Sequence, residues 1–119
     1  MKEIKAFIHR QRIGAVIEAI KEAGFEAAGS ASRARNISVA SVQSLLPAID
    51  SREQRYSLDL GEPVIQEYKL ELLCEDRDAD VLVRIVADAG RTGQEEAGWI
   101  YVTDVGNAVQ IGVARTGES

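Results

Sequence analysis

The sequence predicts an α+β fold made of two successive βαβ units in a single domain, residues 1–119. Runs of β-branched and aromatic residues, typical of strands, occur at Ile4–Ile8, Val64–Cys74 and Trp99–Val102. Segments with apolar residues at helical spacing lie between them, and each ends at a glycine. The length, 119 residues, suits one core. This order predicts the ferredoxin-like split βαβ (βαββαβ) architecture, an antiparallel sheet with both helices on one face.

The first helix is predicted from the apolar residues Ile13, Val16, Ile17 and Ile20, with Gly24 as its end. Residues 25–36 are rich in Ala and Ser and show no clear period. A second strand is expected there mainly because of the segments that come after it in the chain.

Residues 37–62 are predicted to form a long mobile loop, because serines, Pro47, Asp50 and Gly61 interrupt them. Within this loop, 41–46 could form a short helical turn, and 56–60 alternate like a strand. A connection of this length in a small domain is usually functional or disordered.

The second half repeats the pattern. In the strand that ends at Cys74, residues 68, 70, 72 and 74 share one face, while Lys69, Glu71 and Leu73 share the other. Residues 75–78 are predicted to be a turn with capping potential, followed by a helix over 81–89 that Gly90 ends. Residues 91–98 form a loop, 104–107 a turn and 108–113 a last short strand. The uncovered sheet face, with Ile65 and Leu73, would invite a second copy.

Charge and composition exclude several classes of protein. The net charge is −5 and aromatic residues are only 5% of the chain, which argues against a nucleic-acid partner. A single cysteine, Cys74, fits a reducing compartment. No apolar run is long enough to insert into a membrane, and the first residues lack the apolar centre of a signal peptide. We therefore expect a cytoplasmic protein.

No catalytic set is visible, so the chain is not expected to be an enzyme. His9 is the only histidine, at a strand end, and is expected at the surface without a metal. Cys74 falls on the helix-facing side of its strand, which predicts a buried, inert thiol. Arg33 and Arg35 are interpreted as a solvated strand end rather than anion ligands, and the acidic clusters as solvated turns.

Four segments resemble the PII signal-transduction family (nitrogen regulatory protein P-II). Residues 1–8, Met-Lys-Glu-Ile-Lys-Ala-Phe-Ile, resemble its opening strand. Residues 68–73, Tyr-Lys-Leu-Glu-Leu-Leu, resemble its "KIEIVV" strand, and residues 91–102 resemble its "TGxxGDGKIFV" loop and strand. Residues 115–118, Arg-Thr-Gly-Glu, match its "RTGE". The resemblance covers almost the whole chain, and the segment 37–62 lies where the family has its mobile T-loop.

The resemblance implies a homotrimer with three nucleotide sites between subunits, and a T-loop that docks onto a membrane transporter or an enzyme. A Thr-Gly loop offers backbone N–H donors to an anion, and arginine offers a rigid fork for phosphate. The residues predicted to bind a nucleotide or small anion are Arg91, Thr92, Gly93, Gln94, Gly98, Trp99, Glu71, Gln110 and Arg115.

Departures from the family pattern leave the ligand open. Trp99 replaces a lysine, Glu95 and Glu96 add negative charge, and Gln110 and Gly112 stand where the family has arginines. AMP, ADP, ATP, cyclic AMP and bicarbonate all stay candidates, and Mg²⁺ is undecided. Trp99 suits either base stacking or a core or subunit interface. The alternative is a structural or metal-tolerance trimer of the same fold that binds no nucleotide.

Overall fold

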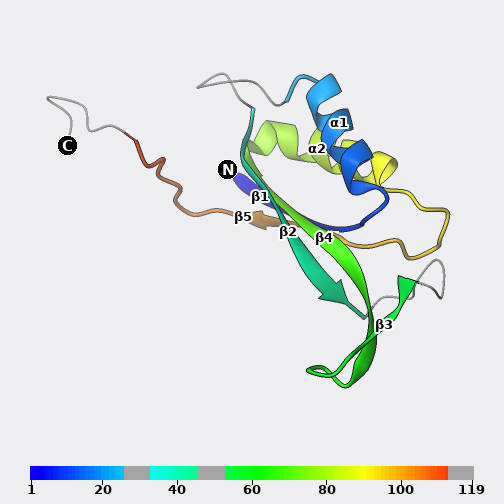
Figure 1. The fold of residues 1–119 in the computed structure, drawn as a ribbon. Helices are drawn as coiled ribbons and strands as arrows, with labels where there is room; N and C mark the ends of the chain where they lie inside the picture. Colours follow the sequence, from blue (N-terminus) through cyan, green and yellow to red (C-terminus); the bar gives the residue numbers. More distant parts are fainter. Residues whose placement is uncertain (26–32, 46–52, 113–119) are drawn as a thin grey trace, which may run out of the picture.

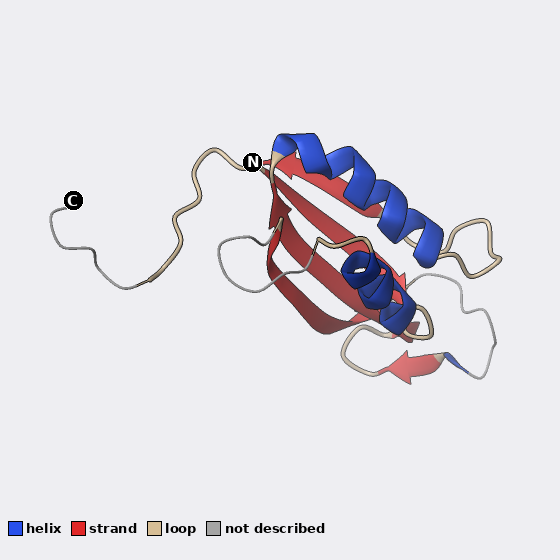
Figure 2. Ribbon diagram, turned by 90° about the horizontal axis from the view of Figure 1, so that it is seen from above, coloured by secondary structure: helices blue, strands red, loops and turns tan. Residues whose placement is uncertain are grey.

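The computed structural model describes residues 1–25, 33–45 and 53–112. Its elements, in chain order, are β1 (Lys2–His9), α1 (Ile13–Glu22), β2 (Ala34–Ser44), β3 (Arg55–Ser57), β4 (Glu62–Cys74), α2 (Asp76–Ala89) and β5 (Ile100–Asp104). The main sheet has the order β2-β4-β1-β5, and all its neighbouring strands are antiparallel. Both helices pack on one face of the sheet (Figures 1 and 2). The predicted split βαβ architecture within the chain is confirmed.

The hydrophobic core lies between the helices and the sheet. Alternate residues of β1 and β4 point into it, as the period of a strand requires. The central buried residues are Ile4, Ala6 and Ile8 of β1, Val16 and Ile20 of α1, Leu70, Leu72 and Cys74 of β4, and Leu82 and Val86 of α2. Burying one such Leu or Ile side chain contributes roughly 1.5–3 kcal/mol. The prediction that Cys74 is buried is confirmed, since the residue is 1% exposed.

The two helices end in different ways. Gly24, after α1, has φ +80°, the left-handed conformation that glycine adopts freely. Gly90, after α2, has φ −83° and ends the helix without a left-handed turn. The prediction of a separate turn at 75–78 is wrong, because α2 already begins at Asp76. Asp76 and Asp78 lie in its first turn, where carboxylates interact favourably with the helix dipole.

The predicted loop 37–62 is too long. Residues 37–44 belong to β2, which pairs with β4 as far as Ser44 opposite Ile65, so the helical turn predicted from residue 41 is wrong. β4 begins at Glu62, and β3 pairs with its first residues. The prediction failed because β2 is an edge strand whose residues are mostly exposed, so its sequence shows no alternation of apolar and polar residues. Pairing with β4 makes it a strand despite its serine-rich composition. The connection between β2 and β3 therefore covers only 45–54.

The last strand predicted at 108–113 is wrong for its described part, residues 108–112. These residues follow β5 as an extended segment that leaves the sheet (Figure 1) and has no strand partner within the described chain. Val109 and Ile111 are 80% and 98% exposed. In the described part of the chain, neither helix is long and apolar enough to cross a membrane.

The sheet face opposite the helices is mixed rather than apolar. Ile65 is buried, and Leu73 is only half-buried. Lys69 and Glu71 form an ion pair there at 3.1 Å. The ring of Phe7 packs against Tyr101 with 5.8 Å between centroids. This face therefore combines aromatic and charged groups.

Candidate functional site

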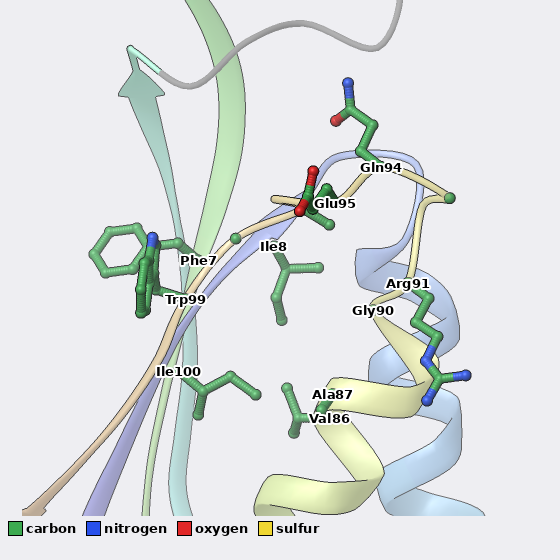
Figure 3. Close-up of a pocket in the computed structure, with 13 residues that line it drawn as sticks. Phe7, Ile8, Val86, Ala87, Gly90, Arg91, Gln94, Glu95, Trp99 and Ile100 are labelled. Carbon is green, nitrogen blue, oxygen red and sulfur yellow. The ribbon is translucent and has the colours of Figure 1, made fainter.

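A cavity of about 410 Å³ opens where the loop between α2 and β5 passes the end of β1 (Figure 3). This volume lies within the range of small-molecule sites. The cavity is lined by Phe7 and Ile8 of β1, Val86 and Ala87 of α2, Gly90, Arg91, Gly93, Gln94, Glu95, Ala97, Gly98 and Trp99 of the loop, and Ile100 of β5. The structure thus brings five of the predicted site residues together around one cavity: Arg91, Gly93, Gln94, Gly98 and Trp99.

The base of the cavity is apolar. The side chains of Ile8, Val86 and Ile100 point toward one another in Figure 3. Ile8 and Val86 belong to the main core, and Ile100 packs against that core, so their positions are fixed by the fold itself. A binding surface of this kind suits the apolar or aromatic part of a ligand.

The loop is held against β1 by a close backbone contact. The backbone N–H of Phe7 donates a hydrogen bond to the carbonyl oxygen of Trp99 at 2.9 Å. Gly98 has φ +151°, and a Cβ atom there would lie 2.1 Å from the carbonyl oxygen of Phe7. Only glycine fits at this position, because any side chain would collide with backbone.

Thr92 shapes the loop rather than lining the cavity. Its hydroxyl oxygen accepts a hydrogen bond from the backbone N–H of Gln94 at 3.3 Å. Gly93, between them, has φ +90°, which a residue with a side chain adopts only with strain. The Thr-Gly sequence therefore makes a tight turn that presents Gly93 and Gln94 to the cavity.

Charge at the cavity rim is balanced rather than strongly positive. Arg91 hydrogen-bonds Asp88 at 3.1 Å, and both side chains are largely exposed. In Figure 3 the Arg91 side chain extends away from Ile8 and Trp99. An exposed pair of this kind is weak, so Arg91 can exchange Asp88 for another anion at little cost. Glu95 also lines the cavity, which disfavours a ligand with many negative charges.

Arg12 is a residue that sequence reasoning missed. Its Nε and Nη2 atoms both donate to the carbonyl oxygen of Ala89, at 3.0 and 2.8 Å. This contact ties the start of α1 to the last residue of α2, immediately before the cavity loop. Arginine is suited to the task because its guanidinium presents donors in a fixed fork. No local signal reveals it, since the partners are 77 positions apart.

Trp99 lies at the cavity edge with 58% of its surface exposed. Trp99 is therefore not a core residue of the single chain, so of the two structural roles expected for it, core or subunit interface, only the interface is left. Stacking on a ligand ring and contact with a second copy both fit this exposure.

Besides Thr92, two described residues of the predicted site do not line this cavity. Glu71 lies in the middle of the uncovered sheet face, opposite Lys5 of β1 and Ser38 of β2. Gln110 lies in the extended segment after β5. Arg115 lies outside the described residues.

The prediction that His9 lies at the surface is wrong. His9 is 3% exposed, and its Nε2 atom lies 2.9 Å from Oε2 of Glu53. The burial arises because Glu53, which precedes β3, folds back onto the end of β1. In the part of the chain that the structure describes, no group of three or more His, Cys, Asp or Glu side chains is placed to hold a metal ion.

Arg33 is more than a solvated strand end. Its guanidinium hydrogen-bonds the buried carboxylate of Asp78 and lies over the ring of Phe25, 4.2 Å from the centroid. The contact holds the pKa of Asp78 below its usual value, mainly through the hydrogen bond from Arg33. Arg33 therefore serves the fold, by neutralising a buried acid.

Comparison with known proteins finds distant relatives over the full length. Nitrogen regulatory protein P-II 1 of Methanothermobacter thermautotrophicus is 27% identical over 99% of this chain and 92% of its own. P-II 2 of the same organism is 29% identical over 100% and 93%. Nitrogen regulatory protein P-II of Rhodobacter capsulatus is 25% identical over 99% and 97%. No family model matches the chain.

Proposed function

Because this chain is a distant full-length homologue of the nitrogen regulatory P-II proteins, we propose that it binds a small effector and signals to a partner protein. The resemblance predicted from the sequence is confirmed at the level of this distant homology. The relatives are named regulatory proteins, which agrees with the prediction that the chain is not an enzyme.

The observation that carries the proposal is the cavity beside β1, because the loop that resembles the family's "TGxxGDGK" segment forms much of its wall. The effector is an adenine nucleotide or a small anion such as bicarbonate. The apolar base and the exposed Trp99 favour a ligand with a flat ring, which stacks well on an aromatic side chain. Arg91 is the one cation among the described lining residues, and Glu95 opposes it. This charge balance favours AMP, ADP or cyclic AMP over ATP with Mg²⁺.

The active assembly in this proposal is a homotrimer. In a single chain Gln110 lies far along a segment that leaves the sheet, beside the exposed Val109 and Ile111. Exposed apolar side chains in an extended segment are typical of a segment that pairs with another chain. A neighbour's Gln110 and Arg115 would then complete the site next to Arg91 and Trp99.

The signalling element in this proposal is the connection between β2 and β3 together with the β3–β4 hairpin. Tyr56, Leu58 and Leu60 near the tip of this hairpin are 65%, 88% and 54% exposed. Exposed apolar groups on an arm of this kind suit docking onto a membrane transporter or an enzyme.

Binding by the full chain tests the proposal. Calorimetry with AMP, ADP, ATP, cyclic AMP and bicarbonate measures affinity, and Trp99, the single tryptophan, reports binding by its fluorescence. We expect Arg91→Gln to weaken binding about tenfold, equivalent to about 1.4 kcal/mol. The matched control Arg84→Gln, on α2 and outside the lining residues, should bind as the wild type does. A folded trimer that binds none of these ligands would overturn the effector part of the proposal.

The charge around the cavity also favours a second candidate, a structural or metal-tolerance trimer that binds no nucleotide. Glu95 at the rim and the single lining cation support it. Thermal unfolding separates the two functions, because a ligand at a hundred times its dissociation constant stabilises a protein by about 2.7 kcal/mol. Stabilisation by divalent metals alone would favour the second candidate, and stabilisation by nucleotides the first.

A further inference from the structure

Three ionisable side chains meet at His9, the last residue of β1, and none of the three lines the effector cavity. His9 is 3% exposed and Glu67 of β4 is 1% exposed. Glu53, at the end of the connection between β2 and β3, has a side chain that is only 7% exposed. Two acids and an imidazole from three separate segments are thus buried together, which folding rarely tolerates without proton uptake or pairing.

The hydrogen bonds define the proton on His9. The backbone N–H of Gln11 donates to Nδ1 of His9 at 3.1 Å, so Nδ1 acts as an acceptor. The proton of a neutral imidazole then lies on Nε2 and is donated to Oε2 of Glu53 at 2.9 Å. The side-chain amide of Gln11 donates to the other Glu53 oxygen at 3.4 Å. These contacts suit a neutral His9 and an ionised Glu53.

Glu67 is in the opposite situation. It is the cross-strand partner of His9, and its Oε1 atom has no hydrogen-bond partner among the described residues. Burial raises the pKa of Glu67, while a hydrogen bond with Ser44 and the proximity of His9 act in the other direction. A buried carboxyl with an unpartnered oxygen favours its neutral, protonated form.

The surrounding groups offer Glu67 little compensation if it ionises. His9 faces it from β1, Ser44 from β2, and Glu53 lies beyond His9. Lys69, two residues along the same face of β4, is bound to Glu71 at 3.1 Å. An ionised Glu67 would place a second negative charge in the cluster that already holds Glu53.

We propose that Glu67, His9 and Glu53 form a proton-controlled latch that holds residues 53 and 54, directly before β3, against the end of β1. While Glu67 is protonated, Glu53 stays docked on His9 and fixes the start of the β3–β4 hairpin to β1. When Glu67 loses its proton, like-charge repulsion and an unsolvated carboxylate favour separation of Glu53 from His9. The latch concerns the fold alone and does not depend on an effector in the cavity.

The direction of the pH effect is set by the sign of the shift. The pKa of Glu67 is higher in the folded protein than its ordinary value. The protonated carboxyl therefore stabilises the closed latch fully at low pH. That contribution is lost as pH rises through the folded pKa. In Glu67→Gln a neutral amide replaces the carboxyl, so the latch should stay closed both below and above that pKa.

The single histidine makes a direct test practical. The imidazole carbon-bound protons of His9 are followed by NMR between about pH 4 and 9, in protein without nucleotide. Ionisation of Glu67 should add a step to this titration, separate from any protonation of the imidazole itself, with a midpoint above about 4.3, the ordinary value for Glu. The step should disappear in Glu67→Gln and persist in the matched control Glu71→Gln, which lies on the same face of β4. Identical titrations in wild type and Glu67→Gln would overturn the latch.

Release of Glu53 has its own readout. The rate of trypsin cleavage after Arg55 in wild type, divided by the rate in Glu67→Gln at the same pH, should rise several-fold across the step. A second variant, Glu53→Gln, keeps an oxygen for His9 but removes the opposing charge, and should move the step to lower pH. Cleavage that does not track the His9 step, or a step unmoved in Glu53→Gln, would contradict the proposal. Because no ligand is present, failure here leaves the effector proposal unaffected.

Discussion

Gly98 and Phe7 are so close that a Cβ atom on residue 98 would lie 2.1 Å from the carbonyl oxygen of Phe7. The neighbouring hydrogen bond, from the Phe7 N–H to the Trp99 carbonyl, extends the pairing of β1 with β5 into the cavity loop. This contact sets the position of the loop, and with it one wall of the cavity.

Gly98→Ala should therefore destabilise the protein. The φ of +151° alone costs a residue with a side chain roughly 1–3 kcal/mol, and the collision with Phe7 adds to that cost. Urea denaturation measures the loss. Gly106→Ala is the matched control, since a Cβ there meets nothing within 4 Å, and it should change stability by no more than about 0.5 kcal/mol. Equal stability of the two variants would show that the loop can move off β1.

Arg12→Lys should loosen the end of α2. A lysine ammonium cannot reproduce the two bonds that Nε and Nη2 of Arg12 direct at the one carbonyl oxygen of Ala89, and losing one such bond costs about 1 kcal/mol. Since the cavity loop starts at the next residue, effector affinity should fall together with stability. Calorimetry and thermal unfolding measure the two effects, with the exposed Arg10→Lys as the control. A variant with unchanged unfolding temperature and affinity would remove Arg12 from the site.

Asp78 should make stability depend on pH in the acid range. Its pKa is held below the ordinary value of about 3.9 by Arg33, so its contribution is complete above that value and lost as pH falls through the folded pKa. Asp78→Asn should lower the urea concentration at the midpoint of unfolding at pH 7. The difference in this midpoint between the variant and wild type should shrink below about pH 4. Asp80→Asn, an exposed neighbour on α2, is the control. A difference that stays constant down to pH 2 would contradict the ion pair.

The core was predictable because its signal is periodic. Alternation over 68–74 and helical spacing from Ile13 to Ile20 each depend on one face being buried, and both faces are buried as expected. The family pattern in residues 91–99 likewise located the loop that lines the cavity.

The remaining features depend on contacts between distant segments. β2 is an exposed edge strand, so its side chains carry no burial period, and only its pairing with β4 defines it. His9 is buried by Glu53, 44 positions away, and Arg12 reaches Ala89. The local sequence does not reveal such distant partners. For this reason the predictions of a surface position for His9 and of a loop over 37–62 were wrong, and Arg12 was missed.

Cys74 provides a test of the core that needs no substitution in it. The residue is 1% exposed, and burial, reinforced by the nearby acids Asp78, Asp76 and Glu75, raises the pKa of its thiol. Only the thiolate reacts quickly with disulfide reagents, so native Cys74 should be modified only through opening of the fold. The reaction with 5,5′-dithiobis(2-nitrobenzoate) should therefore track the population of unfolded chains, and Gly98→Ala should accelerate it about tenfold for each 1.4 kcal/mol of stability that it loses. Rapid modification of the native protein, at the rate of a free thiol and equal in both variants, would mean that β4 and α2 open independently of the rest of the core.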